Sequence, residues 1–288
     1  MRTLILAMIM CSVTSIEVAV SECPRCPHCD RASMSFMFRM RYCKFTLQKA
    51  APLSNEEFRH SAAVQVQQLL SKVLDQDHIM PLITDVVLRK IANPSSPLVL
   101  HFAGDHGVGK THTANLISLA TSLWCKTSNG CETGDNLLII GGSSFQGIEP
   151  VAARQYITSV LARHAATYPN GIVLVNDLSA VDPEIAKIFI PLFGREDSYL
   201  EIPEVNLRLF TVIVTTDLGK GGRSRGKSID ELNAMVTAEF RSQYSGMAGS
   251  MLRTFNFLPV SISGASSICE HSCSQIADAP DIETIAAV

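Results

Sequence analysis

Apolar and polar residues alternate along the chain with two periods, one typical of helices and one typical of buried strands. Helical spacing predicts a helix over 54–74, where Ser54 and Glu57 form a capping box, and another over 79–92, which ends before Pro94. Further helices are predicted over 110–124, 149–168, 183–192 and 228–243, and short apolar runs predict strands over 97–103, 136–140, 171–175, 207–215 and 254–260. This order predicts an α/β fold, a three-layer αβα sandwich with a parallel sheet.

The most specific motif follows the first predicted strand. Residues 104–111 read Gly-Asp-His-Gly-Val-Gly-Lys-Thr, a complete GxxxxGK[ST] phosphate loop between a strand and a helix. Its glycines let backbone N–H groups converge on phosphates, Lys110 is expected to reach the β- and γ-phosphates, and Thr111 to place its hydroxyl on Mg²⁺. The cofactors predicted are therefore ATP and Mg²⁺, as in P-loop nucleotide-binding domains. The residues expected to bind the nucleotide are Gly104, Asp105, His106, Gly107, Val108, Gly109, Lys110, Thr111 and His112.

Polar residues follow two later strands, at the sheet edge where parallel α/β folds bind ligands. Asn176 and Asp177 stand where a phosphate-loop ATPase usually has Asp-Glu. Asn176 is expected to bind Mg²⁺ through a water molecule without adding charge, and Asp177 to polarise the attacking water with a side chain one methylene shorter than Glu. Asp217 stands where a neutral sensor of the γ-phosphate is usual, and it either replaces the missing carboxylate or repels the phosphate. The three are the predicted catalytic residues, and they predict binding with weakened hydrolysis.

The first residues have the layout of a secretory signal peptide. Arg2 precedes an apolar run over 4–11, and Ala19 stands two residues before Ser21. Polar residues interrupt the run early, so no transmembrane span is expected. We therefore predict a signal peptide over 1–21, with localisation in the secretory pathway.

Composition and cysteine usage narrow the classes of partner. The chain has 288 residues, 47% of them hydrophobic, with 24 Lys and Arg against 27 Asp and Glu, which excludes general disorder and a basic nucleic-acid footprint. No nucleic-acid partner is expected, although 219–227 is a local basic, glycine-rich loop. In a leader over 22–53, Cys23, Cys26 and Cys29 have the spacing of zinc ligands or of disulfide partners, and both alternatives stay open.

Four segments together resemble AAA+ ATPases of the torsin and Clp-type group. They cover 74–118, which includes the phosphate loop, then 172–193, 212–221 and 255–260. The resemblance implies an ATPase that works on a protein client as an oligomer or with an activating partner, and torsins reside in the endoplasmic reticulum lumen.

The resemblance also suggests a domain organisation. A helical lead-in over 54–94 would precede an AAA+ domain over 95–262, and 263–288 is expected to form a coil too short for a helical lid. Arg241 and Arg253 lie where an arginine finger could project between subunits, although solvated or helix-capping arginines are the plainer interpretation.

Two classes of function remain. The first is an AAA+ ATPase that couples ATP binding and hydrolysis to protein remodelling. The second is a degenerate nucleotide-binding scaffold that assembles with active AAA+ partners and scarcely hydrolyses ATP. A small-molecule kinase fits less well, because the sensor-like strand end and the helical lead-in have no role there.

Overall fold

The computed structural model describes residues 56–121, 124–127, 130–132, 136–193, 196–218, 226–244 and 252–268. The predicted signal peptide, the cysteine leader, most of the basic loop and the chain beyond residue 268 lie outside these residues. The chain divides into two units, and the larger one ends at Pro259. The described residues of the smaller unit are 260–268.

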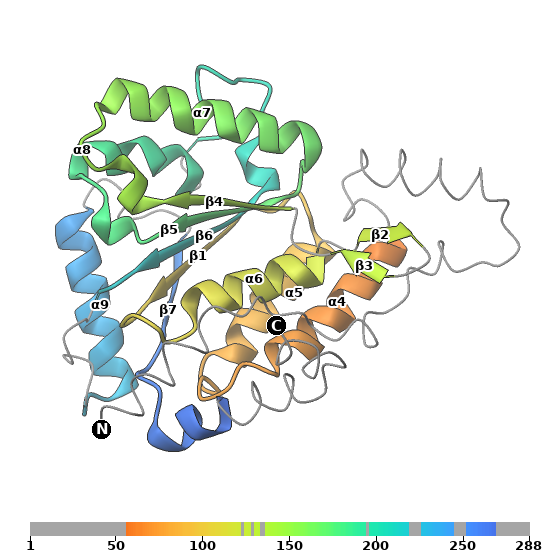
Figure 1. Cartoon of the computed structure of the whole chain (residues 1–288), viewed down its shortest axis with the longest axis vertical. Helices are drawn as coiled ribbons and strands as arrows, with labels where there is room; N and C mark the ends of the chain where they lie inside the picture. The colour runs from red at the N-terminus through yellow and green to blue at the C-terminus, as the bar shows by residue number, and fades with distance from the viewer. Residues whose placement is uncertain are drawn as a thin grey trace, which may run out of the picture. The chain divides into compact units, whose positions relative to one another are not determined.

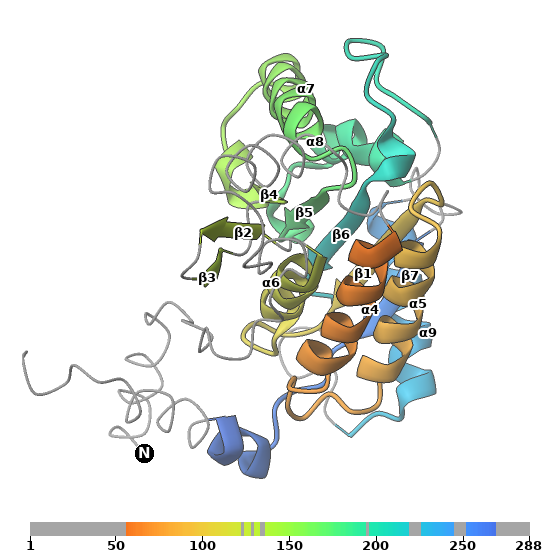
Figure 2. The ribbon, with the colours of Figure 1, turned by 90° about the vertical axis from the view of Figure 1, so that its right-hand side faces the viewer.

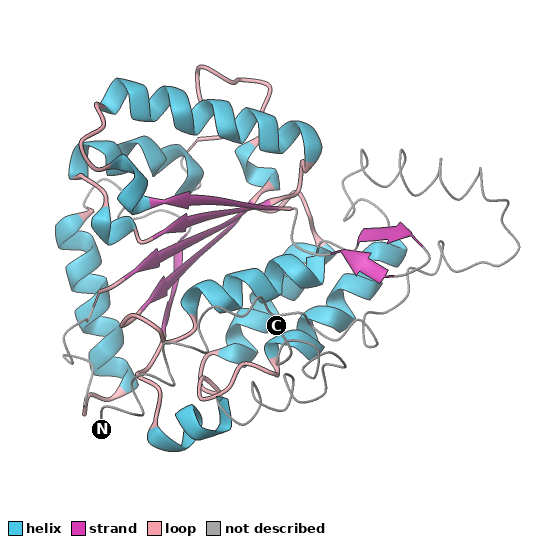
Figure 3. Cartoon of the chain, viewed as in Figure 1, coloured by secondary structure: helices cyan, strands magenta, loops and turns pink. Residues whose placement is uncertain are grey.

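Five parallel strands form the central sheet (Figure 3). They are β1 (Leu98–Ala103), β4 (Leu137–Gly141), β5 (Ile172–Asn176), β6 (Thr211–Thr216) and β7 (Leu252–Asn256). Their order in the sheet is β4-β5-β6-β1-β7, so the first strand in sequence lies between the last two. In register, Ala103 pairs with Thr216 and Gly141 pairs with Asn176, so the carboxyl ends of neighbouring strands lie side by side. This confirms the predicted α/β fold with a parallel sheet.

Helices cover both faces of the sheet (Figures 1 and 2). They are the α-helices α4 (Glu56–Leu70), α5 (Met80–Ala92), α6 (Lys110–Thr121), α7 (Pro150–Thr167), α8 (Pro183–Ala186) and α9 (Ile229–Gln243), and the 3-10 helices η4 (Gly142–Phe145), η5 (Leu178–Ala180), η6 (Lys187–Phe193) and η7 (Leu207–Leu209). Proline stands in the first turn of α5, α7 and α8, where its missing N–H costs nothing. Helix α9 begins with a capping box between Ser228 and Glu231.

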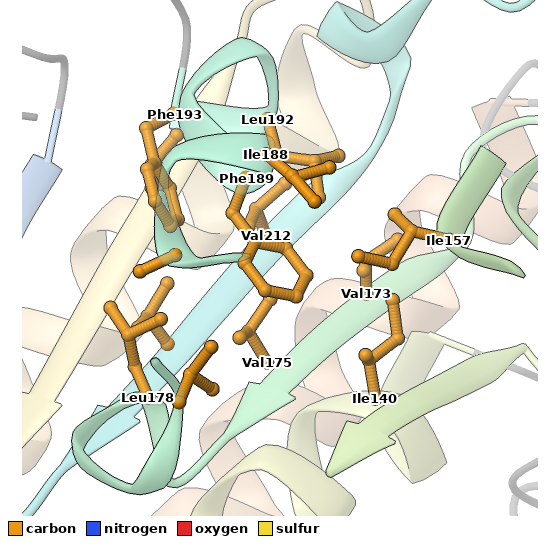
Figure 4. Packing of buried hydrophobic residues seen from close by; sticks show 14 of the residues in the cluster. Ile140, Ile157, Val173, Val175, Leu178, Ile188, Phe189, Leu192, Phe193 and Val212 are labelled. Carbon is orange, nitrogen blue, oxygen red and sulfur yellow. The ribbon is translucent and has the colours of Figure 1, made fainter. Parts of the chain in front are cut away.

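Two apolar cores form because alternate residues of each strand face opposite sides of the sheet. On one side, Leu100 and Leu174 pack with α4, α5 and α6. On the other, Val173 and Val212 pack with α7, η6 and α9, and Phe189 of η6 is fully buried among them (Figure 4). The αβα layering follows from these two cores.

Four predicted elements differ from the structure. The strand predicted over 254–260 is β7, which begins at Leu252 and ends at Asn256. The helix expected to reach Trp124 ends at Thr121, and a hairpin of β2 (Trp124–Thr127) and β3 (Gly130–Glu132) follows, in which the backbone of Cys125 lies opposite that of Cys131. The strand expected over 207–215 begins only at Thr211. The helix expected over 183–192 divides into α8 and η6, because Pro191 cannot donate a helical hydrogen bond.

In the other unit, the expectation of a coil is wrong for residues 262–268, which are helical. The hydroxyl of Ser261 accepts a hydrogen bond from the backbone N–H of Gly264 at 3.0 Å, as an N-cap does. The weak apolar period of this segment gave no sign of a helix, because a short capped turn needs no apolar stripe.

Among the helices that the structure describes, none has the length and apolar character needed to cross a membrane.

Candidate nucleotide-binding site

The phosphate loop joins β1 to α6, and its backbone depends on glycine. Gly104 has a φ of 149°, and a Cβ there would lie 2.6 Å from the carbonyl oxygen of Phe257. Gly109 has a φ of 98°, a conformation that residues with side chains rarely adopt. Helix α6 begins at the next residue, Lys110, so the N–H groups of its first turn face the loop. The sequence therefore builds the strand, loop and helix that the motif requires.

Lys110 is buried beneath the loop and makes three polar contacts. Its Nζ donates to the carbonyl oxygens of Gly104 and Asp105, both at 2.7 Å, and lies 3.2 Å from Oδ1 of Asp217. Burial lowers the pKa of Lys110, and the Asp217 carboxylate opposes that shift. Asp217 follows β6, and its other oxygen, Oδ2, lies 2.9 Å from Nε2 of His106 in the loop. The strand end and the loop are thus joined by a charged contact.

Thr111 and Asn176, the two residues predicted to hold Mg²⁺, are brought together. The hydroxyl of Thr111 donates to Oδ1 of Asn176 at 3.0 Å. The same amide oxygen accepts a hydrogen bond from the hydroxyl of Thr215 on the neighbouring strand β6 at 3.1 Å. A hydroxyl and an amide oxygen at this separation are both oxygen ligands of the kind that Mg²⁺ takes, directly or through water.

Asp177 lies next to this pair and keeps one oxygen unpaired. Its backbone N–H donates to the hydroxyl of Thr215 at 2.8 Å, which anchors the turn after β5. Its Oδ1 is buried and has no hydrogen-bond partner among the described residues. An unpaired buried carboxylate oxygen is costly, so the residues present fit a site that a water molecule or a ligand completes.

Two other residues predicted for the site, and one histidine on β1 that was not predicted for it, have different surroundings. Val108 is 5% exposed and packs into the core beside α6, so it anchors the loop. His112 is half-buried on α6, and burial lowers its pKa. His101 is buried on β1, where its ring nitrogens lie 3.1 Å from the hydroxyl of Thr254 and 2.8 Å from that of Thr216.

His106 and the two candidate finger arginines complete the predicted set. His106, one of the residues expected to bind the nucleotide, places its Nε2 2.9 Å from Oδ2 of Asp217. Arg241 and Arg253 are exposed on α9 and β7. Within the described part of the chain, no three His, Cys, Asp or Glu side chains gather as a metal site.

Sequence reasoning missed several supporting residues. Thr215 connects Asn176 and Asp177, and the hydroxyl of Ser179 accepts a hydrogen bond from the backbone N–H of Asp217 at 2.9 Å. The hydroxyl of Tyr244 donates to the carbonyl oxygen of Leu178 at 3.2 Å, and burial is the main cause that raises its pKa to about 12. The run of threonines that ends β6 was the available signal, because polar residues are unusual at the end of a buried strand.

Comparison with known proteins places this fold. No family model and no curated relative matches the chain. Among solved structures, the chain is similar to Saccharomyces cerevisiae Hsp104 in complex with ADP, with a TM-score of 0.59 and 14% identity, over 84% of this chain and 43% of that one. A closed state of Hsp104 with ATPγS and FITC-casein gives a TM-score of 0.59 and 16% identity, over 86% of this chain and 42% of that one. An S. cerevisiae Hsp104–casein complex in an extended conformation gives a TM-score of 0.59 and 16% identity, over 80% of this chain and 41% of that one.

These similarities define the fold and nothing finer. The five-stranded parallel sheet with helices on both faces is the fold that this chain shares with these Hsp104 structures. This chain spans less than half the length of the Hsp104 chains that it matches.

Proposed function

We propose that this chain is an ATP-binding AAA+ ATPase that couples ATP binding and hydrolysis to the remodelling of a protein client. One observation carries the proposal. The loop lysine Lys110, the Thr111–Asn176 hydrogen bond and the unpaired oxygen of Asp177 meet at the edge of the sheet where α/β folds bind ligands.

The side chains divide the work as follows. Lys110 would bind the β- and γ-phosphates, and Thr111 with Asn176 would hold Mg²⁺, Asn176 through a water molecule. Asp177 would accept a hydrogen bond from the attacking water and orient it. The metal, when bound, would neutralise charge on the phosphates.

Two features of the site favour slow hydrolysis. The amide of Asn176 brings no negative charge to the metal, so the metal would be held more weakly than by a carboxylate. Asp177 reaches less far than the Glu usual at this position. We therefore expect weak activity in the isolated chain, raised by assembly or by a partner.

The finer assignment rests on the sequence. Torsin-like character, a signal peptide over 1–21 and a place in the endoplasmic reticulum lumen are proposed from the motifs and the first residues. The AAA+ domain is proposed to span 95–262. A protein client is also favoured because the similar Hsp104 structures contain casein.

A degenerate scaffold is the second candidate, and the neutral amide of Asn176 favours it. Such a protein would bind ATP and assemble with active AAA+ partners but would scarcely hydrolyse it. The two candidates differ in whether hydrolysis returns when the charge at the metal position is restored.

Phosphate release with Mg²⁺ tests the proposal in wild type, Lys110→Ala, Asn176→Asp and Lys187→Ala. Lys187 is an exposed lysine paired with Glu184, so its variant controls for the loss of a positive charge. Wild type and Lys187→Ala should release phosphate slowly, and Lys110→Ala should not. Asn176→Asp should raise the rate about tenfold or more, because a charged ligand binds the metal more tightly.

The outcomes separate the candidates. Release that Lys110→Ala leaves unchanged would contradict the proposed site. Nucleotide binding without release in wild type and in Asn176→Asp would favour the scaffold. Thr111→Ala, which removes an exposed hydroxyl, serves as a second loop variant if Lys110→Ala does not fold.

A further inference from the structure

Asp217 places a negatively charged carboxylate beside the phosphate loop, where the negatively charged phosphates of a nucleotide would also bind. Its side chain is 6% exposed, and both oxygens face the phosphate loop, Oδ1 toward Lys110 at 3.2 Å and Oδ2 toward His106 at 2.9 Å. Its backbone N–H is held by the hydroxyl of Ser179 at 2.9 Å. The carboxylate is therefore fixed in position by a strand end on one side and by loop side chains on the other.

The contacts of Lys110 show what a phosphate would have to replace. An ammonium group has three N–H donors. The structure gives Lys110 three oxygen partners, the carbonyl oxygens of Gly104 and Asp105 and the carboxylate of Asp217. Of these three, Asp217 carries a full negative charge, so its oxygen holds the place that a phosphate oxygen would take beside the ammonium.

We propose that Asp217 is a specificity-determining residue that makes this site favour ADP over ATP. The inference rests on the proposed nucleotide site. In this type of loop the lysine contacts the β- and γ-phosphates. ATP brings one phosphoryl group and one negative charge more than ADP toward Lys110, and the buried carboxylate repels that additional charge.

The surroundings keep Asp217 from turning away. Ala103 at the end of β1 pairs in register with Thr216, the residue before Asp217, so the strand end cannot move independently of the loop. His106 is 76% exposed and can follow an incoming phosphate, whereas Asp217 is enclosed. The carboxylate therefore stays near Lys110 when a nucleotide binds, and it acts against the additional charge of ATP.

The test measures the dissociation constants of ATP and ADP with Mg²⁺ by calorimetry for three full-length chains. Wild type should bind ADP more tightly than ATP. Asp217→Asn keeps the shape and removes the charge, and it should raise the ATP affinity at least about tenfold relative to ADP. Asp85→Asn is the control, because it removes one negative charge from an exposed residue of α5 that pairs with Arg89 and lies outside the proposed site.

Each result bears on the proposal. Asp85→Asn should leave both dissociation constants as they are in wild type. An ADP-to-ATP affinity ratio that Asp217→Asn leaves unchanged, or that Asp85→Asn changes as much, would overturn the role of Asp217 while nucleotide binding itself still supports the proposed function. Binding of ADP but not ATP by wild type, together with binding of ATP by Asp217→Asn, would support the role of Asp217 and would contradict ATP hydrolysis as the function of the wild-type chain.

Failure of the proposed function would look different. If neither wild type nor Asp217→Asn binds either nucleotide while both melt cooperatively, the proposed function and this inference both fail. Asp217→Thr, a neutral residue of similar volume, replaces Asp217→Asn if that variant does not fold, and the same change in the ADP-to-ATP affinity ratio is expected.

Discussion

Asp177 adopts a left-handed backbone conformation, with φ 58° and ψ 59°, immediately after β5. Asp and Asn tolerate this conformation better than most residues with side chains. Replacing Asp177 with Glu would therefore add backbone strain along with reach. Asn176 is the last residue of β5, and its side-chain oxygen accepts hydrogen bonds from the hydroxyls of Thr111 and Thr215. Asn176→Asp therefore restores a carboxylate at the metal position without backbone strain.

His101 makes stability depend on pH. Burial, with a smaller contribution from Lys110, lowers its pKa to about 3, whereas an unfolded histidine titrates near ~6.5. Because the folded pKa is the lower one, the unfolded chain takes up the proton first, and stability is lost as pH falls below ~6.5. Lowering the pH from ~7.5 to ~5 should therefore reduce the free energy of unfolding by about 2 kcal/mol through His101.

Urea unfolding of wild type and His101→Gln at these two pH values measures that contribution. Gln does not titrate and can still hydrogen-bond Thr216 and Thr254. Between the two pH values, the free energy of unfolding should fall by about 2 kcal/mol less in the variant than in wild type. An equal loss in both chains would show that His101 is not the group responsible.

At the scale of elements, the junction after β4 supports the turn that carries Asp177. A Cβ on Gly142 would lie 2.1 Å from the backbone oxygen of Asp177 and 2.9 Å from Cγ2 of Val181. Neither neighbour is the free end of a flexible side chain. The turn that follows β4 and the turn that follows β5 are therefore packed closely against each other, with no space for a side chain at Gly142.

Gly142→Ala should consequently destabilise the fold by about 1–3 kcal/mol and weaken nucleotide binding, because it displaces Asp177. Gly141→Ala is the matched control, since a Cβ there meets only the hydroxyl of Ser144, at 3.4 Å. Thermal unfolding of both variants checks the first effect. Equal stability of the two variants would contradict the close packing at this junction.

At the scale of the whole molecule, periodicity was enough to predict the layers. Four of the five sheet strands contain a run of apolar residues, whereas β7 (Leu252–Asn256) mixes apolar and polar residues and lies earlier in the chain than predicted. The phosphate loop identifies β1 as the strand that leads into the candidate site. The misses have physical causes. Pro191 divides a helix that has a continuous apolar pattern, and the hairpin after α6 follows an apolar stretch that also suits a helix.

The site was predictable in its members but not in their contacts. The motif and the strand ends name Lys110, Asn176 and Asp217. Which of them touch depends on the strand order β4-β5-β6-β1-β7, and no local pattern encodes that order. The contact between His106 and Asp217 could not be predicted for the same reason.

The most direct measurement is the affinity of the full chain for ATP and ADP with Mg²⁺, in wild type, Lys110→Ala and Lys187→Ala. Wild type and Lys187→Ala should bind with the same dissociation constants. Lys110→Ala should lose at least about tenfold, because a charged hydrogen bond to phosphate is removed. Absence of binding in wild type, or undiminished binding in a folded Lys110→Ala, would contradict the account.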